Sequence, residues 1–422
     1  MSTKATPMLT GYRVLDITQF VAGPTCCRIL GEMGAEVVKL ELAPFGDRTR
    51  AAGFKPMDPK YAKISQSTGF FQHNHCKKSL AMDMKNPRAL ELVKAMLPKF
   101  DVVVENFAPG VIKRLGLGYD VIKQINPKII MCSISVCGQT GPLSSKPGYD
   151  YIGQAYAGIT DQIGEPDRAP SQLTMAAGDI STGVAAAMAV GFALLHRERT
   201  GEGQYLDASI TDTYFHWHHE YLPKVSLRGP AAVPKRNGSQ HPGGGPAGIF
   251  RYRDDQYVYV TVLPHQWPQF VKAIGMPELA SDPRFKNAHA RRDNNEVLKQ
   301  ILEDWLSKFP NREAALAALE KERVPCAPVL SLHESANHPH MRERKTARRV
   351  KDRLIGEFDV PGMPVKFSSW PDRTDVKADL LGESNEAVLR EYLNLPDAEI
   401  RQLYADKVLV HDRILDDEVK QS

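Results

Sequence analysis

Short hydrophobic runs alternate with helical patterns along the first half of the chain. These runs predict four strands, over residues 12–18, 36–41, 101–106 and 128–135. Helices are predicted over residues 23–33 and 87–97. Because helices separate the strands, neighbouring strands should lie parallel, and their nearly continuous apolar character predicts that both faces of the sheet are covered. The pattern indicates an open, doubly wound, Rossmann-like α/β sheet.

The pattern changes after residue 228. Prolines and glycines crowd residues 229–248, and a hairpin pattern follows, in which IFRYR and YVYVTVL flank a DDQ turn. Helices are predicted near residues 266–274, 294–309 and 312–323, with a short strand at 327–330. We therefore predict a large Rossmann-like domain over residues 1–228 and a smaller inserted α+β domain over 229–335. Residues 336–422, with helical patterns at 385–393 and 398–406, are too short to fold alone and should return to the large domain.

Composition adds a broad class to this picture. The chain is 42% hydrophobic and 25% charged, with a formal charge of +4, which is ordinary for a soluble globular protein and no argument for nucleic acid. The most apolar stretch, residues 180–195, is shorter than the roughly 20 residues that span a bilayer, so we expect a buried helix and no membrane. No secretory leader is apparent, and the six cysteines form no CxxC, which favours a reducing cytoplasm.

Several common catalytic motifs are absent. The first strand is followed by DITQFVAGP, so the GxGxxG dinucleotide fingerprint is missing, and GxxxxGK[ST], HExxH and GxSxG are missing as well. The cluster His216–Glu220 offers only a partial ligand set and is more typical of a surface helix, so we expect no metal site.

Asp179 is the strongest candidate for chemistry. It lies in AAGDISTG, directly before the apolar helix, where a carboxylate can cap the helix by accepting backbone N–H bonds. The same place suits a nucleophile, because helix-terminal N–H groups should keep the carboxylate ionised while Gly178 admits a substrate. The local pattern leaves both interpretations open.

The glycine run at Gly243, Gly244 and Gly245 also has two interpretations, an interdomain linker or a mobile lid over a reacting group. Likewise, Lys77, Lys78, Lys85 and Arg114 are either solvated surface charges or, at the loop ends of a parallel sheet, contacts for an anionic ligand.

Several longer segments resemble one known family. GYRVLDITQFVAGP, KKSLAMDMKNP, VENFAPGVIKRLGLGYD, GQTGP, AAGDISTG, HRERTGEGQYLDASI and VPCAPVLSL are similar to motifs of the class III CoA-transferases, the CaiB/BaiF family. The motifs occur in the family's order and span nearly the whole chain. The resemblance implies a large Rossmann-like domain with a smaller inserted domain, and an interlocked homodimer.

The resemblance also assigns roles to particular residues. It implies that Asp179 is the catalytic nucleophile and that Gly243–Gly245 form the lid. The positions that contact CoA in the formyl-CoA transferases of the family correspond here to Ala22, Lys85, Asn106, Phe107, Ala108, Arg114, Tyr149 and Asp150. Lys85 and Arg114 would meet CoA phosphates. No cofactor beyond the CoA thioester substrate is implied.

At three motif positions the sequence differs from members of this superfamily, and these differences narrow the range of expected reactions. Val21 replaces the glutamine of formyl-CoA transferases and Leu42 replaces an arginine, which argues against oxalate and formate as substrates. Tyr149 replaces the histidine base of the racemases in the same superfamily, and a phenol is a poor base at neutral pH.

The leading hypothesis is transfer of CoA from an acyl-CoA thioester to a free carboxylic acid, with dicarboxylic acids among the candidates. The transfer would pass through anhydride and thioester intermediates on Asp179. The alternatives are an isomerase resembling the α-methylacyl-CoA racemases and a non-catalytic protein that binds CoA thioesters.

Overall fold

The computed structural model describes residues 6–58, 64–370, 373 and 375–416. The chain divides into two compact units. The large unit comprises Met1–Ile159, Leu173–His219 and Pro339–Ser422, and the small unit comprises Thr160–Gln172 and Glu220–His338. The small unit thus begins earlier than residue 229 and includes the segment Thr160–Gln172, for which the sequence gives no signal.

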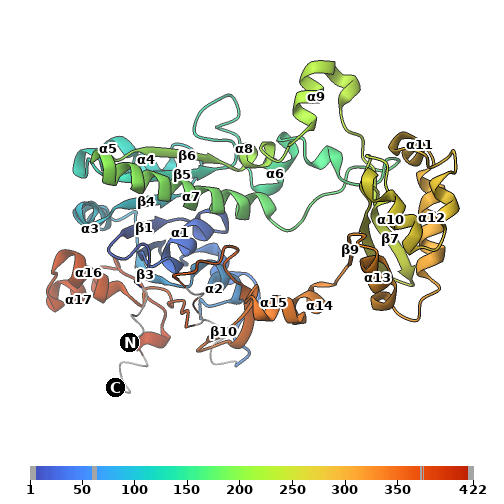
Figure 1. The fold of residues 1–422 in the computed structure, drawn as a ribbon. Coiled ribbons are helices and arrows are strands. Elements are labelled where there is room, and N and C mark those ends of the chain that lie inside the picture. Colours follow the sequence, from blue (N-terminus) through green and yellow to red (C-terminus); the bar gives the residue numbers. More distant parts are fainter. Residues whose placement is uncertain (1–5, 59–63, 371–372, 374, 417–422) are drawn as a thin grey trace. The chain divides into compact units, whose positions relative to one another are not determined.

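The large unit is built on a six-stranded parallel sheet (Figure 1). Its strands are β1 (Arg13–Ile17), β2 (Glu36–Leu42), β3 (Lys77–Met82), β4 (Val102–Glu105), β5 (Ile130–Ser135) and β6 (Tyr205–Ser209). They lie in the order β3-β2-β1-β4-β5-β6, so the chain reverses its direction of progress between β1 and β4. This topology confirms the predicted doubly wound sheet.

Helices cover both faces of the sheet, as the apolar strands predict. On one face, α1 (Ala22–Glu32) and α7 (Ala177–Thr200) pack over residues such as Val14, Val104 and Ile130. On the other, alternate strand residues such as Leu15 and Val103 pack against five helices. These are α3 (Pro87–Met96), α4 (Val111–Arg114), α5 (Tyr119–Ile125), α16 (Asn385–Leu393) and α17 (Asp397–Ala405).

Two strands of this sheet were not predicted from the sequence. β3 begins with Lys77 and Lys78, which are typical of a surface, yet Lys77 is buried and its Nζ lies 2.8 Å from Asp16 Oδ2. β6 has the sequence YLDAS, which contains too few apolar residues to predict a strand. Both complete the sheet through tertiary pairing with β2 and β5.

Helix α7 is longer than the predicted 180–195, and it is not fully buried. Its inner residues, including Ala186 and Val190, pack with α1 and the sheet. Its outer face exposes Ile180, Val184, Met188, Phe192 and Leu195. By length and composition α7 could cross a membrane, although 44% of its most apolar window is buried within the molecule. The predicted burial of this helix therefore holds for its inner face only.

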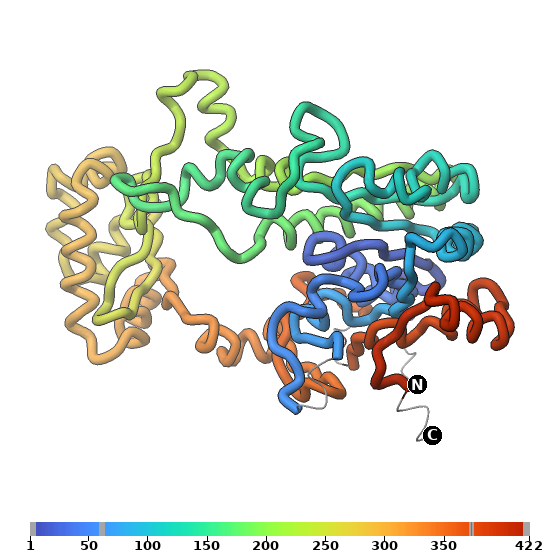
Figure 2. The backbone as a smooth tube through the Cα atoms, turned by 180° about the vertical axis from the view of Figure 1, so that it is seen from behind, coloured from blue at the N-terminus to red at the C-terminus, as the bar shows by residue number. Residues whose placement is uncertain are grey.

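The C-terminal part lies beside the N-terminal strands (Figure 2). The hairpin of β10 (Ala347–Asp352) and β11 (Gly356–Pro361) brings Arg348 to the buried carboxylate of Glu32 on α1, 2.6 Å away. Farther on, the backbone carbonyl of Asp379 accepts from Arg50, and Gly382 N–H donates to Ser79 on β3. Buried polar contacts thus attach this segment to α1, to Arg50 and to β3.

The small unit has its own core under an antiparallel sheet. Its strands β7 (Ala247–Arg253), β8 (Gln256–Thr261) and β9 (Cys326–Pro328) lie in that order. They pack on α10 (Trp267–Ala273), α12 (Asn295–Leu306) and α13 (Arg312–Lys321). Gly238 N–H donates to Gly164 O at 3.0 Å and joins Thr160–Gln172 to this unit.

Gly183 allows α1 and α7 to pack closely at the start of both helices. A Cβ at Gly183 would lie 2.6 Å from Ala22 O and 2.7 Å from Thr25 Cβ. We expect Gly183→Ala to reduce the free energy of unfolding by about 2 kcal/mol, because the overlap exceeds the helical preference of alanine. Gly191→Ala on the same helix is the control, since its Cβ would meet nothing within 4 Å, and it should stabilise by up to about 1 kcal/mol. Urea unfolding measures both; equal effects would contradict the packing argument.

Candidate active site

A cavity of about 430 Å³ lies at the carboxyl ends of β1, β4 and β5 in the large unit. Its walls come from residues 19–22 after β1, 106–109 after β4, 134–137 at the end of β5, and 144 and 146–149, together with Asp179 and Ile210. This is where the strand order reverses, the usual ligand site of a doubly wound sheet. The volume suits a small ligand or one arm of a larger one.

Asp179 occupies the third position of α7 and lines this cavity. The N-cap position belongs to Ala176, which has a left-handed φ of 48° and makes no side-chain cap. The interpretation of Asp179 as the capping carboxylate is therefore wrong. No described residue donates a hydrogen bond to the Asp179 carboxylate, so its oxygens are available to a ligand.

Other side chains cap the helix instead. Asp150, at the start of α6 (Asp150–Tyr156), accepts from Asp179 N–H at 2.7 Å through Oδ2. Its Oδ1 accepts from the hydroxyl of Tyr214, 2.6 Å away on α8 (Ile210–Phe215), and that hydroxyl accepts from Gly178 N–H at 2.9 Å. These two N–H groups at the start of α7 are thus bound by Asp150 and Tyr214.

This arrangement corrects the role expected for Gly178. A Cβ there would lie 2.1 Å from the Tyr214 ring, so glycine is needed for packing against Tyr214. Gly178 itself is buried and does not line the cavity. The first turn of α7 is therefore fixed from behind, while the Asp179 side chain faces the cavity.

The charge state of Asp179 also differs from expectation. Burial raises the pKa of its carboxyl to about 7, and the nearby Asp150 adds to the rise. The expected stabilisation of the ion by the helix terminus does not prevail, so Asp179 holds its proton to a higher pH than an ordinary aspartate. A perturbed carboxyl in a cavity is typical of a catalytic group.

The segment after β4 is joined to the segment after β1. Asn106 accepts from Gln19 N–H at 2.8 Å and donates to Gln19 O at 2.7 Å. Phe107 N–H donates to Glu105 at 2.8 Å, and burial raises the pKa of Glu105 to about 7. Asn106, Phe107 and neighbouring Ala108 all line the cavity, as does Ala22 at the start of α1.

Of the remaining predicted site residues, one lines the cavity and three do not. Tyr149 lines the cavity with its ring 6.0 Å from that of Phe20. Asp150 is buried behind Asp179 and does not line the cavity, so its observed role is to hold α7. Lys85 and Arg114 are exposed outside the cavity lining, on the loop after β3 and on α4. Contact of these two cations with phosphates remains a prediction.

The glycine run belongs to the small unit. Gly244 and Gly245 are buried, and a Cβ on Gly244 would lie 2.1 Å from Ala288 O at the start of α11 (Ala288–Asp293). Gly243 is exposed, and its N–H donates to His241. The run is therefore packed within its own unit, and its action as a lid remains a prediction.

Some residues that line the cavity were not predicted from the sequence. Lys146 is the one cation among the described lining residues, and Ser135 and Cys137 contribute a hydroxyl and a thiol. Lys146 lies three residues before Tyr149, so proximity to that motif was an available signal. No sequence signal marked Ser135 and Cys137, because they are short side chains at the end of a largely apolar strand. In the described part of the chain, no three His, Cys, Asp or Glu are placed to hold a metal ion.

Comparison with known proteins gives consistent matches over nearly the full length. The profile described as CoA-transferase family III matches residues 9–385. An acetyl-CoA:oxalate CoA-transferase of Acetobacter aceti is 36% identical over 92% of this chain and 96% of its own. A succinyl-CoA:glutarate CoA-transferase of Mus musculus is 32% identical over 95% and 90% of the two chains. A crystal structure of a CAIB/BAIF family protein from Brucella suis has a TM-score of 0.79 and 31% identity, covering 92% and 100%.

Proposed function

Because the chain belongs to CoA-transferase family III, we propose that Asp179 is the nucleophile through which it moves CoA between an acyl-CoA thioester and a carboxylic acid. One observation carries this assignment. Asp179 presents a carboxylate without a hydrogen-bond donor among the described residues into a cavity at the carboxyl edge of the sheet. Such a group can attack an acyl carbon without first breaking a protein contact.

The reaction then proceeds in four balanced steps. An Asp179 oxygen attacks the thioester carbonyl, giving a mixed anhydride and CoA thiolate. The thiolate attacks the Asp179 carbonyl, giving an aspartyl-CoA thioester and releasing the donor acid. The acceptor carboxylate attacks that thioester, giving a second anhydride and again CoA thiolate. Finally the thiolate attacks the acceptor's acyl carbon, which forms the new acyl-CoA and regenerates Asp179. Overall, the donor acyl-CoA and the acceptor acid are consumed, and the new acyl-CoA and the donor acid are formed.

We propose a dicarboxylic acid as the acceptor. The related enzymes are named for oxalate, glutarate and citramalate, each of which carries two carboxylates. Lys146 in the cavity lining offers a cation for the carboxylate that does not react. Lys224, Arg228 and Lys235 belong to the small unit and do not line this cavity, and Lys224 pairs with Glu220 at 3.1 Å.

Covalent trapping tests the nucleophile. The protein is incubated with succinyl-CoA or acetyl-CoA, treated with hydroxylamine or borohydride, and digested for mass spectrometry. We expect the modification on Asp179 and none in Asp179→Ala. Modification elsewhere would reject the assignment, and deuterium uptake at the substrate α-carbon without CoA exchange would favour the isomerase. Binding of CoA with no exchange would favour a binding protein.

The acid limb of the pH profile should follow Asp179. The nucleophile must be ionised, so kcat/KM should rise about tenfold between pH 6 and pH 8 with a midpoint near 7. Asp150→Asn removes the neighbouring charge and should move the midpoint to lower pH. A profile that is flat across pH 6–8, or unmoved in that variant, would contradict Asp179 as the titrating group.

We also propose that two copies assemble, as the family resemblance implies, and that the cytoplasm is their setting. The exposed apolar face of α7, with Val184, Met188 and Phe192 at 40–64% exposure, supports the assembly. The six cysteines are free, which suits a reducing compartment. Analytical ultracentrifugation should find a dimer that Phe192→Lys weakens; a monomeric wild type at micromolar concentration would reject it.

A further inference from the structure

The turn between β1 and α1, residues 18–21, has a strained conformation, and residues 19–21 form part of the cavity wall. Phe20 has a φ of 66°, a left-handed backbone conformation that is unfavourable for a bulky side chain. The Phe20 ring contacts Tyr149 edge to face, with an interplanar angle of 75°. Strain of this kind persists only where surrounding contacts hold it in place.

Two side chains outside the cavity bind the backbone of the turn, one at the residue before Gln19 and one at the residue after it. Lys39 on β2 donates from Nζ to Thr18 O at 2.8 Å. Asp47 accepts from Phe20 N–H at 3.2 Å through Oδ1. Together with Asn106, which binds the residue between them, they leave the strained turn little freedom to relax.

Lys39 and Asp47 also bind each other. Lys39 Nζ lies 2.9 Å from Asp47 Oδ2, and both side chains are about 1% exposed. Burial alone would lower the pKa of Lys39, but Asp16 and Asp47 outweigh it and the pKa is raised. Burial alone would raise the pKa of Asp47, but Lys39 outweighs it and that pKa is lowered. Both groups are therefore charged, and a paired charge in a buried site has few alternative positions.

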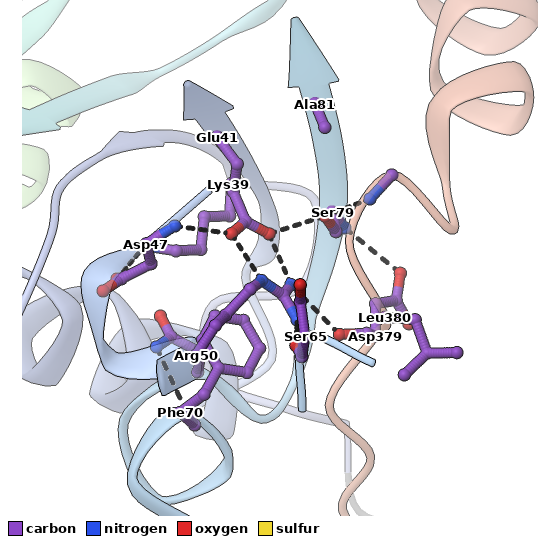
Figure 3. Close-up of polar contacts among 12 residues, drawn as sticks. Lys39, Glu41, Asp47, Arg50, Ser65, Phe70, Ser79, Ala81, Asp379 and Leu380 are labelled. Atoms are coloured by element: carbon purple, nitrogen blue, oxygen red, sulfur yellow. Dashed lines mark hydrogen bonds and ion pairs between the residues drawn. The ribbon is translucent and has the colours of Figure 1, made fainter. Parts of the chain in front are cut away.

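A second layer fixes Asp47 in turn. Its N–H donates to Glu41 at 3.0 Å, and Arg50 Nε binds the same Glu41 oxygen at 2.7 Å. Figure 3 shows the Glu41 carboxylate between Asp47 and Arg50, with Arg50 alongside the Phe70 ring. The hydroxyl of Thr49 donates to Asp47 Oδ1 at 2.8 Å. None of these residues lines the cavity, so any effect on its chemistry must pass through the turn.

We propose that the Lys39–Asp47 ion pair positions Phe20, and that Phe20 with Tyr149 excludes water from the cavity during the aspartyl stage of transfer. This inference rests on the proposed function. Water that attacked the aspartyl-CoA thioester would release CoA thiol and regenerate the Asp179 carboxylate, so acyl-CoA would be lost. The acceptor carboxylate attacking the same carbon instead gives an anhydride and CoA thiolate, from which the new acyl-CoA forms. The ratio of hydrolysis to transfer therefore measures how well Phe20 and Tyr149 exclude water from the cavity.

A double-mutant cycle tests the coupling. We expect Asp47→Asn and Phe20→Gly each to raise the ratio of hydrolysis to transfer about tenfold. The double variant should match Phe20→Gly alone, because Asp47 would act only through the Phe20 ring. The proposal would be overturned if the double variant showed the product of the two single effects. It would also be overturned if Phe20→Gly left the ratio unchanged. If Asp47→Asn does not fold, Thr49→Val replaces it, since it removes one of the bonds that orient Asp47.

Two further measurements separate positioning from stability and from the proposed function. Asp352→Asn is the matched control, because Asp352 is also buried but binds Gln66 and Leu354 and should leave the ratio unchanged. The fluorine resonance of 4-fluorophenylalanine incorporated at position 20 should shift in Asp47→Asn as the ring leaves Tyr149. If the wild type transfers no CoA, the proposed function fails, whereas an unmoved fluorine resonance overturns the positioning.

Discussion

Asp179→Asn is expected to reduce CoA transfer at least about 10³-fold, because an amide cannot form the anhydride or be regenerated as a carboxylate. The neutral side chain keeps the size of the original, so the cavity and its walls should remain. Binding of CoA thioesters, measured by calorimetry, should change much less than turnover. Steady-state kinetics with a panel of acyl-CoA donors and acids measures the loss.

The same substitution should stabilise the folded protein above neutral pH. The native pKa of about 7 exceeds the usual value of 3.8, so the native state binds more protons than the unfolded chain between those two pH values. Stability therefore falls as pH rises through this window, and the full penalty is present above pH 7. Removing the carboxyl should recover at most about 4 kcal/mol at pH 8 and nothing below pH 3.8.

Thermal unfolding of wild type and Asp179→Asn at several pH values tests the sign. The difference in Tm should grow from pH 4 to pH 8. A variant that is less stable at every pH would show that the carboxylate is satisfied in the folded state, contrary to its lack of a donor among the described residues. Asp304→Asn serves as a control on an exposed helical carboxylate in the small unit, and its effect should be small.

Asp150→Ala should lower kcat/KM about 100-fold, because the first turn of α7 would lose the acceptor that holds it. Asp179 N–H and the Tyr214 hydroxyl would both be left without their partner. Leaving such buried groups unpaired should also reduce the free energy of unfolding by about 1–3 kcal/mol. Kinetics and urea unfolding measure the two effects.

Milder variants distinguish positioning from charge. Asp150→Asn can still accept from Asp179 N–H and should retain most of the activity at high pH. Tyr214→Phe removes only the hydroxyl that binds Asp150 and Gly178, so its loss should be smaller than that of Asp150→Ala. If Asp150→Asn lost as much activity as Asp150→Ala at pH 8, the charge of Asp150 would itself take part in the reaction.

The architecture of the sheet follows from local patterns along the chain. Buried parallel strands such as β1 and β4 contain short apolar runs, and the glycine and proline positions that follow them are local signals. The motif around Asp179 is also a local signal, and it predicts a candidate nucleophile at the start of a helix. Strands β3 and β6 escaped because pairing with β2 and β5, rather than their own residues, makes them strands.

The chemical environment of the site, in contrast, arises from packing between distant segments. Asp150 and Tyr214 lie 29 and 35 residues from Asp179 along the chain, and no local spacing predicts that they cap α7 and leave the Asp179 carboxylate free. The raised pKa of Asp179 likewise comes from burial and from a neighbouring charge. Local preference is written into adjacent residues, whereas desolvation and charge proximity exist only once the folded chain has brought remote groups together.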